Sequence, residues 1–167
     1  SAFTWQSMVG FLPTYLQVSK GFSPSLANTG FAALFVVGAV AKPTAGAVGD
    51  AVSRSLLAAT VLLAAAATLV VLVVATSPAV VLAAVVVFAL GLMAFPPVMQ
   101  AHLMDSFPTD SMGGDLGAMR TVYIGLGALG PTVVGATADA YDFTLAFSGL
   151  VGCLLVSSLL VALVSRR

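Results

Sequence analysis

The chain has 167 residues, of which 60% are hydrophobic and 7% are charged, and its six basic residues balance six acidic ones. An average soluble chain carries about 25% charged residues, so a mean hydropathy of +1.12 and this charge content exclude a fold whose surface faces water. Zero net charge without clustered Lys or Arg also argues against a nucleic-acid partner, because neutralising phosphates needs such clusters.

Six apolar runs follow one another along the chain, each close to the roughly 20 residues that a bilayer-crossing helix needs. Polar or Gly/Pro-bearing breaks separate them. The runs cover residues 2–19, 25–46, 55–75, 79–104, 116–138 and 143–164. Although β-branched stretches such as residues 70–74 favour strands in water, lipid requires each segment to pair its own backbone groups. We therefore expect an all-α membrane protein, with residues 1–167 forming one bundle of six transmembrane helices in the lipid bilayer.

The distribution of Lys and Arg predicts the orientation, because cytoplasmic loops retain these residues. With six spans, one side of the membrane collects Lys42, Arg54, Arg120, Arg166 and Arg167, against Lys20 alone on the other. Both ends of this segment are therefore expected in the cytoplasm, and the protein in the cell (plasma or inner) membrane. Lys42 lies one turn inside its run and is expected to snorkel towards the headgroups.

A faint internal repeat relates the first three runs to the last three. Three pairs of residues recur at an offset of 84 positions: Pro24 with Pro108, Gly30 with Gly114, and Gly46 with Gly130. An odd number of spans in each unit forces the two units into opposite membrane orientations. The sequence thus predicts two inverted three-helix repeats, about residues 1–76 and 77–167.

The break between the second and third runs carries the most specific pattern. Gly46, Asp50 and Arg54 match in type and approximate spacing the hinge loop of the major facilitator superfamily, although Ala51 and Ser53 stand where that loop has a basic residue and a glycine. With the glycine and proline pattern of the later runs, the chain resembles the C-terminal six-helix half of this family, helices seven to twelve. Asp50 is expected to cap the third helix. The alternative is that Asp50 and Arg54 only mark the membrane edge.

This resemblance implies secondary active transport of a small solute by alternating access. It also implies an N-terminal six-helix half of the same chain, absent here, and a cytoplasmic latch that includes Asp50. Polar groups inside spans are functional candidates, because they are costly in lipid. The first and fourth helices of each half line the path in this family. We therefore expect the following residues to line the substrate path: Gln6, Tyr15, Met93, Phe95, Gln100 and, in the fifth run, Tyr123.

Gating or hinge roles are expected where small, helix-breaking or charged residues lie near the cytoplasmic side. Gly46 and Gly49 should let another helix approach closely. Pro96 and Pro97 should bend the fourth helix, and Gly130 and Pro131 should make the fifth flexible. Arg120 fits a loop-pairing role with Asp105 or Asp115 better than a substrate contact. The full set of hinge candidates is Lys42, Gly46, Gly49, Asp50, Arg54, Pro96, Pro97, Arg120, Gly130 and Pro131.

Other functional classes have less support in the sequence. A six-span channel or a non-facilitator carrier lacks any selectivity-filter run or ring of charges here. An intramembrane enzyme would need facing catalytic residues, and the single histidine, His102, lies near a membrane edge. A six-helix scaffold without transport activity is a further alternative. We expect no cofactor, no metal and no enzymatic activity, and Cys153, as the single cysteine, is expected to be a small apolar residue.

Overall fold

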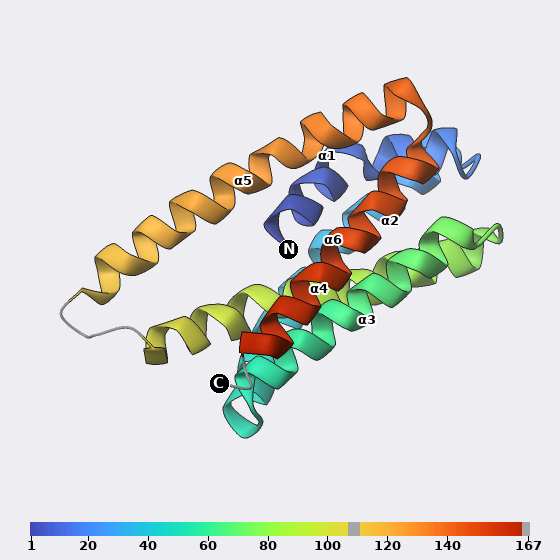
Figure 1. Ribbon diagram of the computed structural model, residues 1–167. Coiled ribbons are helices and arrows are strands. Elements are labelled where there is room, and N and C mark those ends of the chain that lie inside the picture. Colours follow the sequence, from blue (N-terminus) through green and yellow to red (C-terminus); the bar gives the residue numbers. More distant parts are fainter. Residues whose placement is uncertain (107–110, 165–167) are drawn as a thin grey trace.

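Six helices make up the part of the chain that the computed structural model describes, residues 1–106 and 111–164. They follow the predicted runs in order: α1 (Ala2–Val18), α2 (Pro24–Ala51), α3 (Arg54–Val74), α4 (Pro78–Ser106), α5 (Met112–Ala140) and α6 (Phe143–Val164). Figure 1 shows the α1–α2, α3–α4 and α5–α6 turns at one end of the bundle, and the α2–α3 turn and the end of α4 at the other. No strand occurs in the described residues, so the predicted all-α fold class is confirmed.

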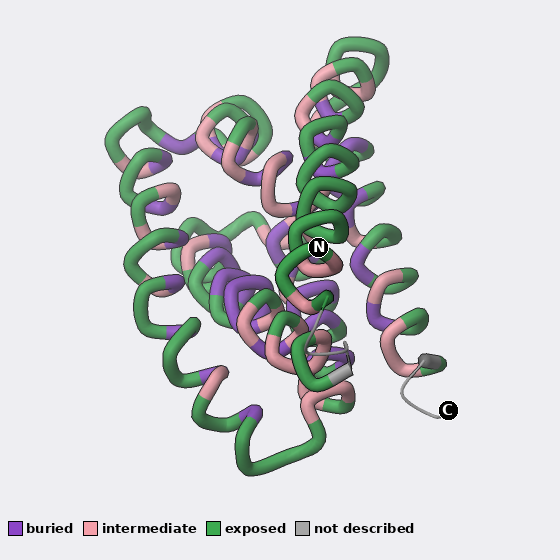
Figure 2. Tube along the Cα trace, turned by 90° about the vertical axis from the view of Figure 1, so that its left-hand side faces the viewer, coloured by how far each residue is buried: buried purple, intermediate pink, exposed green. Residues whose placement is uncertain are grey.

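The helices have the length and surface of membrane spans. Five of them, α2 to α6, are long and apolar enough to cross a membrane. α1 has 17 residues, at the short end of the roughly 17–25 that such helices have. Large apolar side chains such as Val36, Leu63 and Val156 are exposed, and Figure 2 shows exposed residues along the outward sides of the helices. Lipid is the solvent that suits this surface, as in an integral membrane protein.

The α2 helix runs further than the sequence indicated. Residues 47–51, expected to belong to the break, continue the helix to Ala51, and only Val52 and Ser53 form the turn before α3. Glycines do not end the helix here, because each turn still pairs its backbone groups, as Val52 N–H does with Val48 O at 3.2 Å. The prediction that α2 ends near Gly46 was therefore wrong.

Prolines inside the helices do not interrupt them either. Pro96 and Pro97 lie within α4, and Pro131 lies within α5. Both helices continue through these residues, as prolines in membrane helices are able to do when neighbours satisfy the freed carbonyl groups. The bend expected at Pro96 and Pro97 stays a prediction.

The bundle is built from four long packing contacts. α3 packs along α4 and α6, α2 packs along α4, and α1 packs along α5. The centre of the core holds large buried side chains, among them Tyr15 of α1, which stacks on Phe147 of α6 with ring centroids 3.9 Å apart. These contacts leave one side of α5 without a helical neighbour, as Figure 1 shows.

Small residues set how closely the helices approach. A Cβ atom added to Gly91 of α4 would lie 2.8 Å from the carbonyl oxygen of Val61 in α3. One added to Gly130 of α5 would lie 2.5 Å from the carbonyl oxygen of Phe3 in α1. Only glycine fits backbone contacts of this kind. No described helix makes such a contact at Gly46, because nothing lies within 4 Å of its Cβ position, and the close approach expected there stays a prediction.

Lys20 fastens the α1–α2 turn to the end of α3. Its Nζ donates hydrogen bonds to the carbonyl oxygens of Val73 at 2.7 Å and Ala75 at 2.8 Å. The last carbonyls of a helix have no partner within the helix and carry partial negative charge, so a lysine stabilises them. The sequence indicated Lys20 only as a lone cation on the non-cytoplasmic side.

Replacing Gly91 with Ala tests the α3–α4 contact. The added methyl group meets backbone atoms that cannot turn aside, so we expect Gly91→Ala to destabilise the protein by about 1–3 kcal/mol. Gly149→Ala is the matched control, because its Cβ position has open space, and it should raise stability by up to about 1 kcal/mol. Thermal unfolding of the purified full-length protein measures both variants, and equal melting temperatures would contradict the assigned contact.

Candidate functional site

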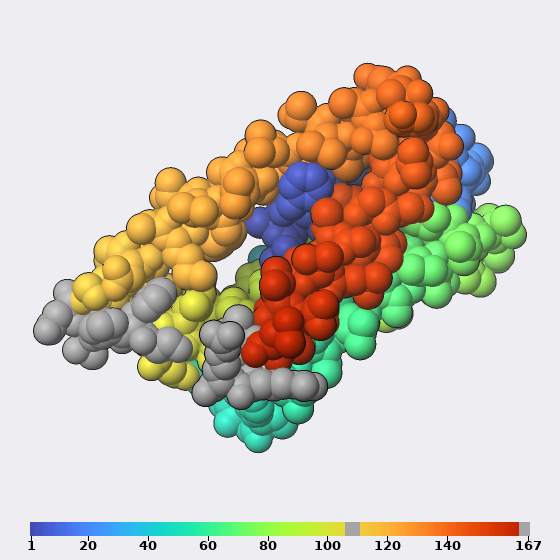
Figure 3. All heavy atoms as spheres, in the orientation of Figure 1, coloured from blue at the N-terminus to red at the C-terminus, as the bar shows by residue number. Residues whose placement is uncertain are grey.

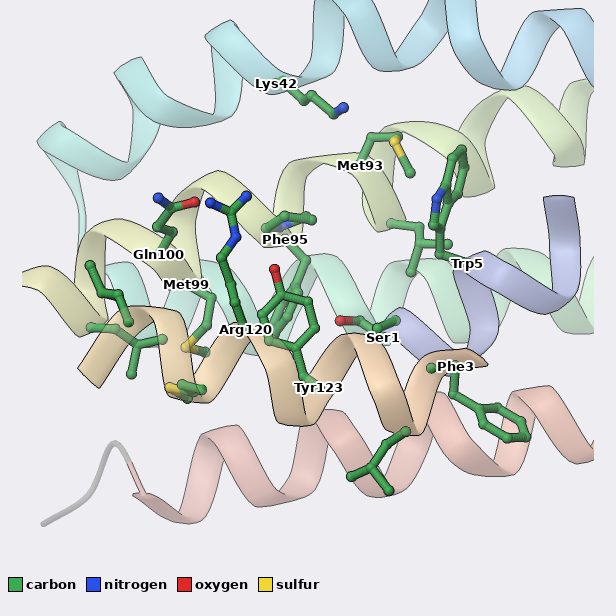
Figure 4. Close-up of a pocket in the computed structure, with 18 residues that line it drawn as sticks. Ser1, Phe3, Trp5, Lys42, Met93, Phe95, Met99, Gln100, Arg120 and Tyr123 are labelled. Atoms are coloured by element: carbon green, nitrogen blue, oxygen red, sulfur yellow. The ribbon is translucent and has the colours of Figure 1, made fainter. Parts of the chain in front are cut away.

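A cavity of about 720 Å³ lies between α1, α2, α4 and α5. Figure 3 shows the molecule open between α5 and α4, and Figure 4 shows the side chains around this space. The lining is mainly apolar. Its polar side chains are those of Ser1, Trp5, Lys42, Gln100, Arg120 and Tyr123. A volume of this size is typical of small-molecule sites, which run from roughly 300 to 1,000 Å³.

Helical periodicity explains how α4 and α5 face the cavity. On α4, Met93, Pro96 and Gln100 recur every three or four residues and therefore share one face of the helix. On α5, the same spacing places Arg120 and Tyr123 on one face, continued by Gly127. Since α4 and α5 make few contacts with each other, their facing stripes enclose space rather than packing together.

Several of the expected lining residues meet in this cavity. Met93, Phe95 and Gln100 of α4 line it together with Tyr123 of α5. Figure 4 shows the Gln100 amide and the Tyr123 hydroxyl pointing into the same space. Their role as substrate contacts stays a prediction.

Two expected lining residues lie elsewhere. Tyr15 is fully buried against Phe147, and its hydroxyl has no hydrogen-bond partner among the described residues. Gln6 lies on α1 outside the cavity and is half-buried. Both were assigned because they are polar residues of the first span, and the rotation of α1 brings Phe3 and Trp5 to the cavity instead.

Three residues assigned to hinges also line the cavity. Lys42 of α2, Pro96 of α4 and Arg120 of α5 belong to its wall. Arg120 was placed near the start of its span, but α5 begins at Met112, so Arg120 lies more than two turns inside the helix. The i, i+3, i+7, i+11 spacing of Leu116, Met119, Tyr123 and Gly127 is the sequence signal that would have indicated this face.

The other hinge candidates on α5 serve packing against α1. Gly130 meets the backbone of Phe3, and Pro131 lies 3.6 Å from the Cβ position of Gly10. On α2, the Cβ position of Gly49 has ordinary contact with Val98, at 3.6 Å. The hinge roles of these three residues stay predictions.

A second candidate site is a charged group at the predicted cytoplasmic end, which we name the Arg54 cluster: Asp50, Arg54 and Asp105. The Arg54 guanidinium donates to Asp50 Oδ1 at 2.8 Å and forms an ion pair with Asp105. It also donates to the carbonyl oxygen of Ala101 at 3.4 Å. The cluster therefore joins the ends of α2, α3 and α4.

The contacts around Arg54 show that two predictions from the sequence were wrong. Asp50 does not cap α3; the Ser53 hydroxyl accepts from Leu56 N–H instead, because α2 extends past Asp50 and leaves Ser53 at the cap position. Arg120 does not pair with Asp105 or Asp115: Asp105 binds Arg54, and Asp115 accepts from the Ser111 hydroxyl at 2.6 Å. The packing of α4 along α3 brings Asp105 to the start of α3, which no local pattern in the sequence shows.

Residues 1–106 and 111–164 contain no group of three or more His, Cys, Asp or Glu side chains placed to hold a metal ion. The side chains around the cavity are suited to binding a ligand. They offer apolar and aromatic contacts, the Gln100 amide, the Tyr123 phenol and two cationic side chains. Such a lining is able to bind a small solute reversibly.

Replacing Asp105 with Asn tests the Arg54 cluster. The Asp50 and Asp105 side chains are 71% and 64% exposed, and exposed ion pairs stabilise proteins only weakly. We expect Asp105→Asn to lower the melting temperature slightly at low salt, and the difference to vanish at about 1 M salt, where such pairs are screened. Asp139→Asn, an exposed carboxylate that forms no ion pair with described residues, is the control. A deficit of Asp105→Asn that persists at high salt would contradict a screened surface pair.

Comparison with known proteins agrees with this architecture. The sequence profile described as Major Facilitator Superfamily matches residues 1–167. No curated protein matches the chain. The profile covers the whole chain, and the all-helical bundle with five helices suited to membrane spans is consistent with half of this fold. The chain therefore belongs to the major facilitator superfamily, a family of membrane transporters.

Proposed function

We propose that this chain is the C-terminal six-helix half of a transporter that moves a small solute across the cell membrane by alternating access. The observation that carries the proposal is the cavity of about 720 Å³ lined by α1 and α4, with α2 and α5 beside them. The first and fourth helices are the ones that the family resemblance assigns to the substrate path. In this proposal the cavity is the part of the solute site that this half contributes.

The helix pairing supports a repeat of two three-helix units. In such a repeat, α1 corresponds to α4 and α2 corresponds to α5. The α1–α5 pair therefore corresponds to the α4–α2 pair, and both pairs pack along their length. In transporters of this kind, units or bundles rock against one another around a fixed site. A second six-helix half would close the cavity on the side left open in Figure 3.

The Arg54 cluster supports the assignment of one end of the bundle to the cytoplasm. It lies at the same end as the start of α5, where Lys42 and Arg120 reach the cavity, whereas Lys20 lies at the opposite end. This asymmetry is what retention of cations in cytoplasmic loops produces. In the proposal, rocking of the two halves changes the contacts of the cluster with the second half.

Cysteine accessibility tests alternating access. Tyr123 lies near the middle of α5 and lines the cavity, so Tyr123→Cys should react with a membrane-impermeant maleimide in both right-side-out and inside-out vesicles. The full-length protein is used, in a background from which Cys153 and any other cysteine have been removed. Labelling from both sides is expected because a carrier site opens to each side in turn.

Three matched positions calibrate the labelling. Ser53→Cys, in the α2–α3 turn, should react only in inside-out vesicles, and Ser77→Cys, in the α3–α4 turn, only in right-side-out vesicles. Val156→Cys, an exposed apolar position on α6, should face lipid and react in neither. Labelling of Tyr123→Cys from one side alone, or from neither, would contradict the proposal, and exchanged sides for Ser53 and Ser77 would reverse the orientation.

A further inference from the structure

Two cationic side chains project into the cavity. Lys42 comes from α2 and Arg120 from α5, and no acidic side chain of the described residues lines the same space. Figure 4 shows the Lys42 ammonium and the Arg120 guanidinium entering the space from opposite walls, with the Gln100 amide beside Arg120. The charge of this wall is therefore positive.

These two cations differ from the other described ones in their surroundings. Arg54 is held by two carboxylates, and Lys20 by two carbonyl oxygens. Neither Lys42 nor Arg120 forms an ion pair with a described residue. Both side chains are exposed, and a charged side chain within membrane-spanning helices typically faces a water-filled cavity or a partner of opposite charge. An anionic group of a solute bound between them is such a partner.

The rest of the lining fits an apolar body. Trp5, Phe95 and Tyr123 offer aromatic surface, and Met93 and Met99 offer flexible, polarisable side chains. A guanidinium such as that of Arg120 binds a carboxylate, sulfonate or phosphate with paired hydrogen bonds, and Gln100 is able to donate another. The anionic group and the apolar part of a solute would thus contact different parts of the cavity wall.

We propose that the solute is an amphipathic organic anion, whose anionic group binds between Arg120 and Lys42 and whose apolar part contacts Trp5, Phe95 and the methionines. This inference rests on the proposed transport function and adds the chemical class of the solute. It also assigns Lys42 and Arg120, expected from sequence to be snorkelling and loop-pairing residues, to anion recognition.

Three probes of the same shape and different charge test the proposal: benzoate, uncharged benzamide and cationic benzamidine. Their binding to the purified full-length protein in nanodiscs is measured by equilibrium dialysis at neutral pH, with protein-free nanodiscs correcting for partition into lipid. We expect saturable binding of benzoate, at least about tenfold tighter than that of benzamide, because a charge-assisted hydrogen bond is worth about that factor or more. Benzamidine should bind more weakly than either.

Variants locate the binding. Arg120→Gln and Lys42→Gln should each weaken benzoate binding about tenfold and leave benzamide binding within about twofold, and Arg120→Lys should restore part of the benzoate affinity. Lys20→Gln removes the same charge at the opposite end of the bundle and should leave benzoate binding unchanged. Size-exclusion profiles and benzamide binding show that each variant is folded.

Three results would overturn the proposal: absence of saturable benzoate binding, equal affinity for benzoate and benzamide, or a benzoate preference that survives the double replacement of Lys42 and Arg120. Equal affinity is also what a carboxylate from the second half of the full chain would produce by neutralising the two cations. Labelling of Tyr123→Cys from both sides of the membrane would still hold in that case. Failure of the anion assignment and failure of the transport proposal are thus distinguishable.

Discussion

Close contact between small residues is the interaction on which the bundle depends. Lipid tails are as apolar as the helix surfaces, so no hydrophobic force drives the helices together, and they associate where their backbones come near enough for extensive van der Waals contact. At Gly91 the α4 backbone lies against Val61 of α3, and at Gly130 the α5 backbone lies against Phe3 of α1. Lipid also favours helices, which pair almost all of their own backbone groups, and α2, α4 and α5 continue through internal prolines although each proline frees a carbonyl group.

The cavity follows from where these contacts stop. α5 is held to α1 at Gly127 and Gly130, whereas its earlier glycines, such as Gly117 and Gly125, have nothing within 4 Å of their Cβ positions. The first half of α5 therefore stands away from α4, as Figure 1 shows. The stripes of larger side chains on the two helices face each other across that gap and line the cavity. Close packing along one half of α5 and open space along the other thus place the cavity beside the first half of this helix.

The cationic side chains fall into two groups, one that joins helix ends and one that lines the cavity. Arg54 ties three helix ends together through Asp50 and Asp105, and Lys20 binds the last carbonyls of α3, so both cations serve the fold. Lys42 and Arg120 have no such carboxylate among the described residues and line the cavity. In a chain with 7% charged residues, each cation is costly in lipid and is retained where something compensates it. The compensation is structural for the first pair and, in our proposal, comes from the solute for the second.

The amino-acid sequence by itself determined the solvent, the fold class, the six helices and the family, because composition, run length and the Gly46–Asp50–Arg54 spacing are local properties. It also indicated α4 side chains, such as Gln100, that the structure places in the cavity lining. Only the tertiary structure decided that Tyr15 belongs to the core, that Asp105 binds Arg54, and that Lys42 and Arg120 reach one cavity from two different helices. The physical reason is that a side chain's surroundings depend on the rotation of its helix and on neighbours distant in sequence, such as Phe147 beside Tyr15, and neither is encoded in a local pattern.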